Sequence, residues 1–198
     1  MKILWCIILG LTPFLLNEDE AINITTELVE PQLLSPEDFH VQYYPNDCYK
    51  EAGYLSGSQK YGYWQFFYPN GTPQSKGHFY NSEKQDYWIY YDSLGYVNSQ
   101  GSYSNNKFHG YWKFYNSFEQ LKECGPFRNG EKYGWWLFFD ENGFKISEGR
   151  FEKNQKNGYW KYYEQDQLES EGAYLKNQKD GEWKYYKGKS LASVILYD

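Results

Sequence analysis

The stretch Gly158-Tyr159-Trp160-Lys161-Tyr162-Tyr163 decides the fold, because its pattern returns at a nearly constant step along the chain. The tryptophans of this pattern are Trp64, Trp88, Trp112, Trp136, Trp160 and Trp183. A second series keeps the same step of 24 residues, shortened to 23 in the last copy, and consists of Gly53, Gly77, Gly101, Gly125, Gly149 and Gly172. Two markers that stay in register over this many copies predict a repeat array.

A single copy of the repeat predicts a β-hairpin. Residues Gly134–Phe139 are mostly aromatic, which suits a pleated strand, and Asp140–Gly143 supply turn chemistry. A second strand should end near Phe151, and residues 152–157 should form the return turn. No apolar stripe with a helical period is present, so helix is disfavoured. We therefore expect an all-β fold, one elongated antiparallel sheet of tandem hairpins with about twelve strands.

Alternation along a strand assigns the two faces of the sheet. Each Trp shares its face with the aromatic residue two positions later, and this face should be the structural core. A Gly in the neighbouring strand lets the Trp ring lie over the backbone. The predicted core therefore consists of the six tryptophans together with Gly77, Gly101, Gly125, Gly149 and Gly172.

The opposite face mixes rings with polar and basic residues. Its candidate partner-binding residues are Tyr87, Tyr111, Trp135 and Tyr159, with Lys113 and Lys161 between the rings. A contiguous exposed aromatic strip usually marks an interaction site. The alternative is that these rings only pack on one another, and the sequence leaves both possibilities open.

The first 37 residues differ from the array. Residues 1–16 resemble a secretory signal peptide, and residues 17–37 form an acidic segment that predicts a disordered linker. The array then occupies residues 38–198, with a degenerate first repeat that carries His40 in place of Trp and a shortened last one. We expect export to the periplasm, the cell surface or the medium, or a cytoplasmic location if residues 1–16 are not a signal. The apolar run is too short for an integral membrane span.

The composition excludes several partners and chemistries. The net charge is −6 and the array is nearly balanced, so no basic footprint for nucleic acid exists. His40, His78 and His109 fall at different phases of the repeat, and no metal-ligand or catalytic motif is present. Glu148 and Glu171 share one phase and should form a solvated stripe. We expect neither a cofactor nor an enzyme, and no disulfide between Cys48 and Cys124, which lie about three repeats apart.

The segment from Glu171 to Trp183, which combines Glu-Gly-x-Tyr with Asn-x-x-Asp-Gly-x-Trp, resembles the MORN repeat in its bacterial variant form. Arrays of this kind are often labelled antitoxin-like, of the YwqK type, and the resemblance covers residues 38–198. It implies a sheet of successive hairpins that serves as a protein-interaction scaffold. The chain departs from the pattern at Asp86, which replaces the Gly before Trp, and at Phe118-Glu119, which replace the turn Gly.

Two functions of different class follow from this sequence. The first is a non-catalytic scaffold that binds a protein partner at the cell envelope or outside the cell. The alternative is a module that binds carbohydrate or cell wall, with envelope polysaccharide as the partner, because aromatic-rich Gly-Trp repeats also resemble choline- and glucan-binding arrays. The shorter period of those arrays and their paired Gly-Trp motifs argue against this alternative.

Overall fold

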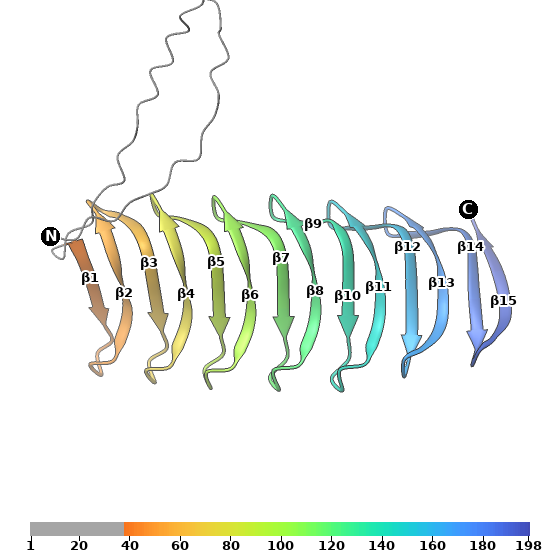
Figure 1. The fold of residues 1–198 in the computed structure, drawn as a ribbon, viewed down its shortest axis with the longest axis horizontal. Helices are drawn as coiled ribbons and strands as arrows, with labels where there is room; N and C mark the ends of the chain where they lie inside the picture. Colours follow the sequence, from red (N-terminus) through yellow and green to blue (C-terminus); the bar gives the residue numbers. More distant parts are fainter. Residues whose placement is uncertain (1–37) are drawn as a thin grey trace, which may run out of the picture. The chain divides into compact units, whose positions relative to one another are not determined.

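A computed structural model describes residues 38–198, which form one antiparallel β-sheet without an α-helix. The strands follow one another in chain order, and neighbours in the chain pair with each other, except that β10 pairs with β8 and the short strand β9 pairs with β8 alone (Figure 1). The predicted sheet of tandem hairpins is confirmed. The strands are β1 (Phe39–Tyr43), β2 (Tyr49–Ser56), β3 (Gln59–Phe67), β4 (Pro73–Tyr80), β5 (Glu83–Tyr91), β6 (Val97–Ser104), β7 (Lys107–Tyr115), β8 (Leu121–Arg128), β9 (Glu131–Lys132), β10 (Gly134–Phe139), β11 (Lys145–Glu152), β12 (Gln155–Glu164), β13 (Gln167–Leu175), β14 (Gln178–Lys187) and β15 (Ser190–Tyr197).

The sheet has 15 strands, more than the twelve or so predicted. Both end segments form complete strands, β1 and β15, and the short strand β9 is separated from β10 at Tyr133. His40 of β1 takes the place of a Trp, opposite Gly53 of β2. The predicted leader 1–16 and linker 17–37 lie outside the described residues.

The wide turn between a Trp strand and the following Gly strand has the predicted chemistry. In the turn Asp140–Gly143, the carboxylate of Asp140 accepts hydrogen bonds from the backbone N–H groups of Asn142 and Phe144, each at 2.9 Å. Gly143 adopts a φ of 85°, a conformation that glycine takes without steric cost. This turn therefore closes the hairpin between β10 and β11 as the sequence indicates.

The return turn is much shorter than predicted. Instead of residues 152–157, only Lys153 and Asn154 lie between β11 and β12, with φ of 50° and 63°. Two central residues of positive φ form a type I′ turn, whose twist matches that of the flanking strands. The prediction was wrong because polar character alone does not end a strand, and Gln155, Lys156 and Asn157 continue the sheet as part of β12.

Each tryptophan lies over the glycine of the preceding strand. A Cβ atom added to Gly101 would lie 2.3 Å from the ring of Trp112, and the other five pairs give 2.2 to 2.5 Å. All six indoles have 0% exposed surface. The indole N–H of Trp112 donates to the carbonyl of Ser102 at 2.8 Å, and the corresponding bond recurs in every copy. The missing side chain thus allows both burial and a satisfied donor.

The tryptophans are buried although the sheet is a single layer. On this face, called the Trp face, Trp136 stacks on Phe138 at 6.2 Å between ring centroids, and Phe138 stacks on Trp160 at 6.0 Å. In five of the six copies a lysine four residues before the Trp covers the indole, and Lys132 Nζ lies 4.0 Å from the ring of Trp136. The cation–π geometry lets the aliphatic stem exclude water while the ammonium group stays near the surface. In the third copy Phe108 replaces the lysine, with its ring centroid 4.2 Å from that of Trp112.

Each of these lysines has one of two partners. When the residue two positions after Trp is Phe, a Glu in the preceding strand pairs with the lysine, as Glu123 does with Lys132 at 2.7 Å. When that residue is Tyr, its hydroxyl accepts a hydrogen bond from the lysine, as Tyr162 does from Lys156 at 2.8 Å. A buried Ser then replaces the Glu in the preceding strand. The Glu solution occurs at Lys60 and Lys132, and the Tyr solution at Lys84, Lys156 and Lys179.

Candidate functional site

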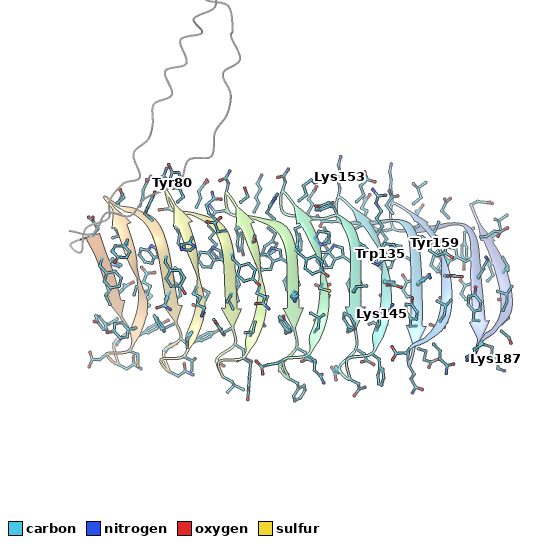
Figure 2. The ribbon with its side chains drawn as sticks, viewed as in Figure 1. Tyr80, Trp135, Lys145, Lys153, Tyr159 and Lys187 are labelled. Atoms are coloured by element: carbon cyan, nitrogen blue, oxygen red, sulfur yellow. The ribbon has the colours of Figure 1, made fainter. Side chains whose placement is uncertain are left out.

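The candidate partner-binding rings lie on the face opposite to the Trp face, called here the opposite face. Tyr87, Tyr111, Trp135 and Tyr159 precede the buried tryptophans, and their exposed fractions lie between 44% and 51%. Trp135 and Tyr159 occupy equivalent places in β10 and β12 (Figure 2). The sheet therefore presents one large ring to solvent in each of these four repeats, at a regular step, whereas Glu182 takes this place before Trp183.

The two lysines predicted between the rings have different surroundings. Lys113 is exposed and lies between Gln100 of β6 and Cys124 of β8. Lys161 lies between Glu148 of β11 and Glu171 of β13, with its Nζ 4.0 Å from a carboxylate oxygen of Glu171. Among residues 38–198, Lys113 forms no ion pair, so its charge remains available to a partner.

Glu148 does not belong to a solvated stripe, and that prediction was wrong. Its side chain is 15% exposed, and its carboxylate accepts hydrogen bonds from Tyr163 at 2.5 Å and from Trp135 at 3.4 Å. Lys145 Nζ lies 3.0 Å from the same carboxylate. Burial alone raises the pKa of Glu148, but the hydrogen bonds from Tyr163, Lys145 and Trp135 outweigh it, so the pKa lies below its usual value.

Glu171 is enclosed in the same way, with 13% of its side chain exposed. It accepts a hydrogen bond from the Tyr186 hydroxyl at 2.7 Å. Burial, with a further contribution from Glu171, raises the pKa of Tyr159 to about 12. The two carboxylates therefore fix the orientation of neighbouring rings, and the sequence missed this because the donors lie 15 residues away along the chain.

The ring of Tyr111 is anchored differently. Its hydroxyl donates to the sulfur of Cys124 at 3.0 Å, and burial together with this hydrogen bond raises the pKa of Tyr111 to about 12. Cys124 is buried and Cys48 is half-buried, and both are free thiols. Tyr111, Trp135 and Tyr159 thus have polar edges that hydrogen-bond to neighbouring strands, which reduces the entropy lost when a partner binds.

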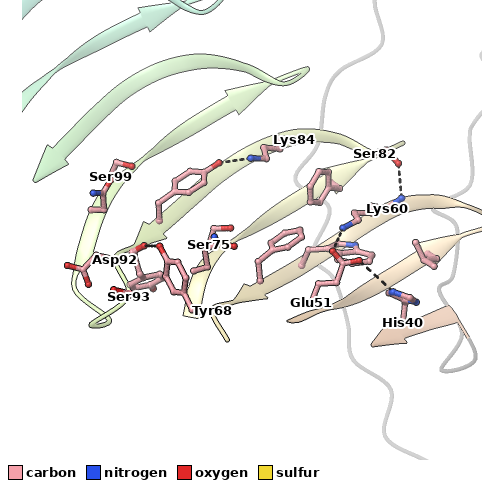
Figure 3. A pocket seen from close by; sticks show the side chains of 18 of the residues that line it. His40, Glu51, Lys60, Tyr68, Ser75, Ser82, Lys84, Asp92, Ser93 and Ser99 are labelled. Atoms are coloured by element: carbon pink, nitrogen blue, oxygen red, sulfur yellow. Dashed lines mark hydrogen bonds and ion pairs between the residues drawn. The ribbon is translucent and has the colours of Figure 1, made fainter. Parts of the chain in front are cut away.

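A groove that the sequence did not indicate lies on the Trp face over β1–β6. It has a volume of about 1120 Å³, and Lys60 lies in it between Glu51 and the turn residue Ser82 (Figure 3). Glu51 is 2.7 Å from Lys60 and 3.6 Å from His40, while burial lowers the pKa of Lys84 farther along the groove. Glu51 and Lys60 are therefore paired with each other in the groove, and Lys84 donates to the hydroxyl of Tyr90.

The described part of the chain contains no cluster of His, Cys, Asp and Glu able to hold a metal ion. His40, His78 and His109 lie in three different strands, β1, β4 and β7. No helix within residues 38–198 has the length and apolar character needed to cross a membrane.

No protein-family model matches the sequence, and no curated protein is detectably similar to it. Among solved structures, the chain is similar to part of the Glycosylation Associate Protein (Gap123) complex from Streptococcus agalactiae. That likeness has a TM-score of 0.31 and 17% identity, over 56% of this chain and 20% of the other. A second likeness is to accessory secretory protein 1, 2 and 3 of Streptococcus pneumoniae, with a TM-score of 0.19 and 12% identity, over 67% of this chain and 21% of the other. The chain thus spans about a fifth of the length of either match.

Proposed function

We propose that the chain is a non-catalytic scaffold of the MORN-like type, which binds a protein partner at the cell envelope or outside the cell. The partner contacts the opposite face through Tyr87, Tyr111, Trp135 and Tyr159, with Lys113 and Lys161 as polar contacts. The observation that carries the proposal is that about half of the surface of each ring is exposed, whereas the buried core of the sheet is formed by the tryptophans of the Trp face.

Two physical properties support this face as an interface. Tyr and Trp offer a large contact area with few rotatable bonds and keep a polar edge, which is why they are enriched among interface hot spots. The rings recur once per two strands, about 10 Å apart, so several weak contacts to one extended partner add up through multivalency. The uncommitted charge of Lys113 lies near the middle of this row and favours a partner with an acidic group.

Site-specific photocrosslinking in the cells that produce the protein tests the proposal. A photoreactive phenylalanine analogue replaces Tyr111 in one variant and, as a control, Phe118, an exposed residue of the turn between β7 and β8, in another. We expect a discrete protein adduct, identified by mass spectrometry, from position 111 and not from position 118. Adducts of equal yield at both positions would contradict the proposed interface.

A second variant separates binding from folding. The quadruple substitution of Tyr87, Tyr111, Trp135 and Tyr159 by Ser should keep the cooperative unfolding transition and lose the adduct partner. The control substitutes four exposed apolar residues of the wide turns, namely Leu94, Tyr96, Phe118 and Phe144. Loss of the fold in the first variant would show that the rings are structural. Retention of an isolated cell-wall polysaccharide by the wild-type protein, lost in the quadruple variant, would favour the carbohydrate alternative.

A further inference from the structure

The last strand, β15, has an edge that no other strand of residues 38–198 covers. It pairs with β14 on one side only. After an irregularity near Ala192, the regular segment Ser193–Tyr197 carries no charge and no proline. Val194, Ile195 and Leu196 are 49%, 44% and 70% exposed. Natural edge strands are normally protected by a lysine, a proline or a bulge, and this segment has none of these.

The stacking that builds the array cannot continue across this edge. Ile195 lies opposite Trp183, at the place that Gly occupies in every earlier repeat. In the earlier repeats, a Cβ atom added to the glycine would lie within 2.5 Å of the indole of the next strand. Ile195 carries a complete side chain at this place. The ring of a further Trp strand therefore cannot pack over the backbone of β15 as it does in the array. The same holds for β1, where His40 takes the place of a Trp.

We propose that β15 instead pairs with β15 of a second copy of this chain, antiparallel, about a two-fold axis at Ile195. An axis normal to the sheet places Ile195 opposite itself on the Trp face and keeps the two Trp faces on the same side. On the opposite face, Val194 lies opposite Leu196 of the partner subunit. The sheet then continues through the interface with the usual spacing of about 4.8 Å between strands.

Self-complementarity is what makes a second copy the occupant of this edge. In this register no charge faces a like charge, every pair near the axis is apolar on both faces, and the open backbone groups of alternate residues find partners. The β1 edge is less suitable, since that strand has five residues against eight in β15. The inference concerns a different surface from the proposed partner-binding face and does not depend on it.

Two double variants test the register by sedimentation velocity and light scattering on the full chain. Val194→Glu with Leu196→Glu places like charges opposite each other twice in the dimer, and we expect the dissociation constant to rise about 100-fold or more. Val194→Glu with Leu196→Lys places opposite charges there and should restore dimers. Within each chain, a glutamate at position 194 faces Lys184 and a lysine at position 196 faces Glu182, so the hairpin itself remains compatible.

The control places two glutamates at Leu94 and Phe118, which are each 75% exposed and lie in turns. This control should dimerise like the wild type, and tryptophan fluorescence should show that every variant is folded. The proposal is overturned if the wild type is a monomer at all concentrations, or if it forms open polymers. It is also overturned if the Glu/Lys variant stays as monomeric as the Glu/Glu variant, because a nonspecific apolar contact would be lost in both.

Discussion

The close approach of glycine and tryptophan gives the sharpest test of how the array is held together. In Gly101→Ala, the new Cβ would lie 2.3 Å from the Trp112 ring, whereas carbon atoms in contact prefer about 3.5 to 4.0 Å. The ring must therefore move by more than about 1 Å. The ring has no room to move, since the ring centroids of Phe108 and Phe114 lie 4.2 Å and 5.7 Å from that of Trp112.

The magnitude follows from two losses. Overpacking of a close-packed core costs about 1 to 3 kcal/mol, and a displaced ring gives up the 2.8 Å bond from its N–H to Ser102, which costs about 1 to 3 kcal/mol when the donor stays buried. The two losses overlap, so we expect Gly101→Ala to lower the free energy of unfolding by about 3 kcal/mol. Urea titration followed by tryptophan fluorescence measures it.

The mechanism predicts that this cost depends on the ring. In a Trp112→Ala background the Cβ introduced by Gly101→Ala meets no indole. The substitution should then be neutral or slightly stabilising, because alanine loses less backbone entropy than glycine on folding. Ser102→Ala, one residue along the same strand, serves as the control and should cost less than about 1 kcal/mol. An equal cost of Gly101→Ala in both backgrounds would refute the reasoning.

Three further predictions concern the polar groups of the sheet. Glu123→Ser should destabilise the fold by about 1 to 3 kcal/mol in urea titrations, since Lys132 loses its partner. Adding Phe138→Tyr should recover most of the loss, because the new hydroxyl accepts the hydrogen bond of the lysine. Absence of recovery would contradict the view that Glu and Tyr are alternative partners of the lysine. The lowered pKa of Glu148 contributes stability that is present above its ordinary pKa of 4.5 and disappears as the pH falls through the lowered value. Glu148→Gln should therefore flatten the acid limb of a stability–pH curve, and an unchanged limb would contradict this. Burial raises the pKa of Tyr90 above its ordinary value of 10.0, so the stability it contributes is complete below pH 10 and lost at higher pH. Tyrosinate absorbance at about 295 nm should show a fraction of phenols that ionises only on alkaline unfolding, and titration of all phenols before unfolding would argue against it.

The sequence predicted the features that depend on spacing and alternation. The step between Trp136 and Trp160, with Gly149 between them, is enough to infer paired strands and a ring over a bare backbone. The half-exposed positions of Tyr111 and Tyr159 likewise follow from alternation within one strand.

The features that depend on register were not predictable in the same way. Lys132 reaches Glu123 across a two-residue turn, and nothing in a single copy distinguishes this turn from a longer polar loop. Glu148 finds its donor Tyr163 in the next strand, so its burial becomes apparent only when strands are aligned with their bulges. The groove over β1–β6 was missed for a related reason, because a ring-rich face implies a covered core and a single layer leaves part of it open.

The two alternative lysine partners have a consequence for how such a chain can be cut and joined. Glu51, Lys60, Trp64 and Phe66 all lie within β2, β3 and the tight turn between them, and none lies across a wide turn. The unit that must stay intact is therefore a Gly strand followed by a Trp strand. It is not the hairpin of a Trp strand and the following Gly strand, which the sequence repeat suggests. Chimeras spliced at wide turns such as Asp140–Gly143 inherit matched partners. Splices at the tight turns mix the halves, leaving some lysines with two acceptors and others with none.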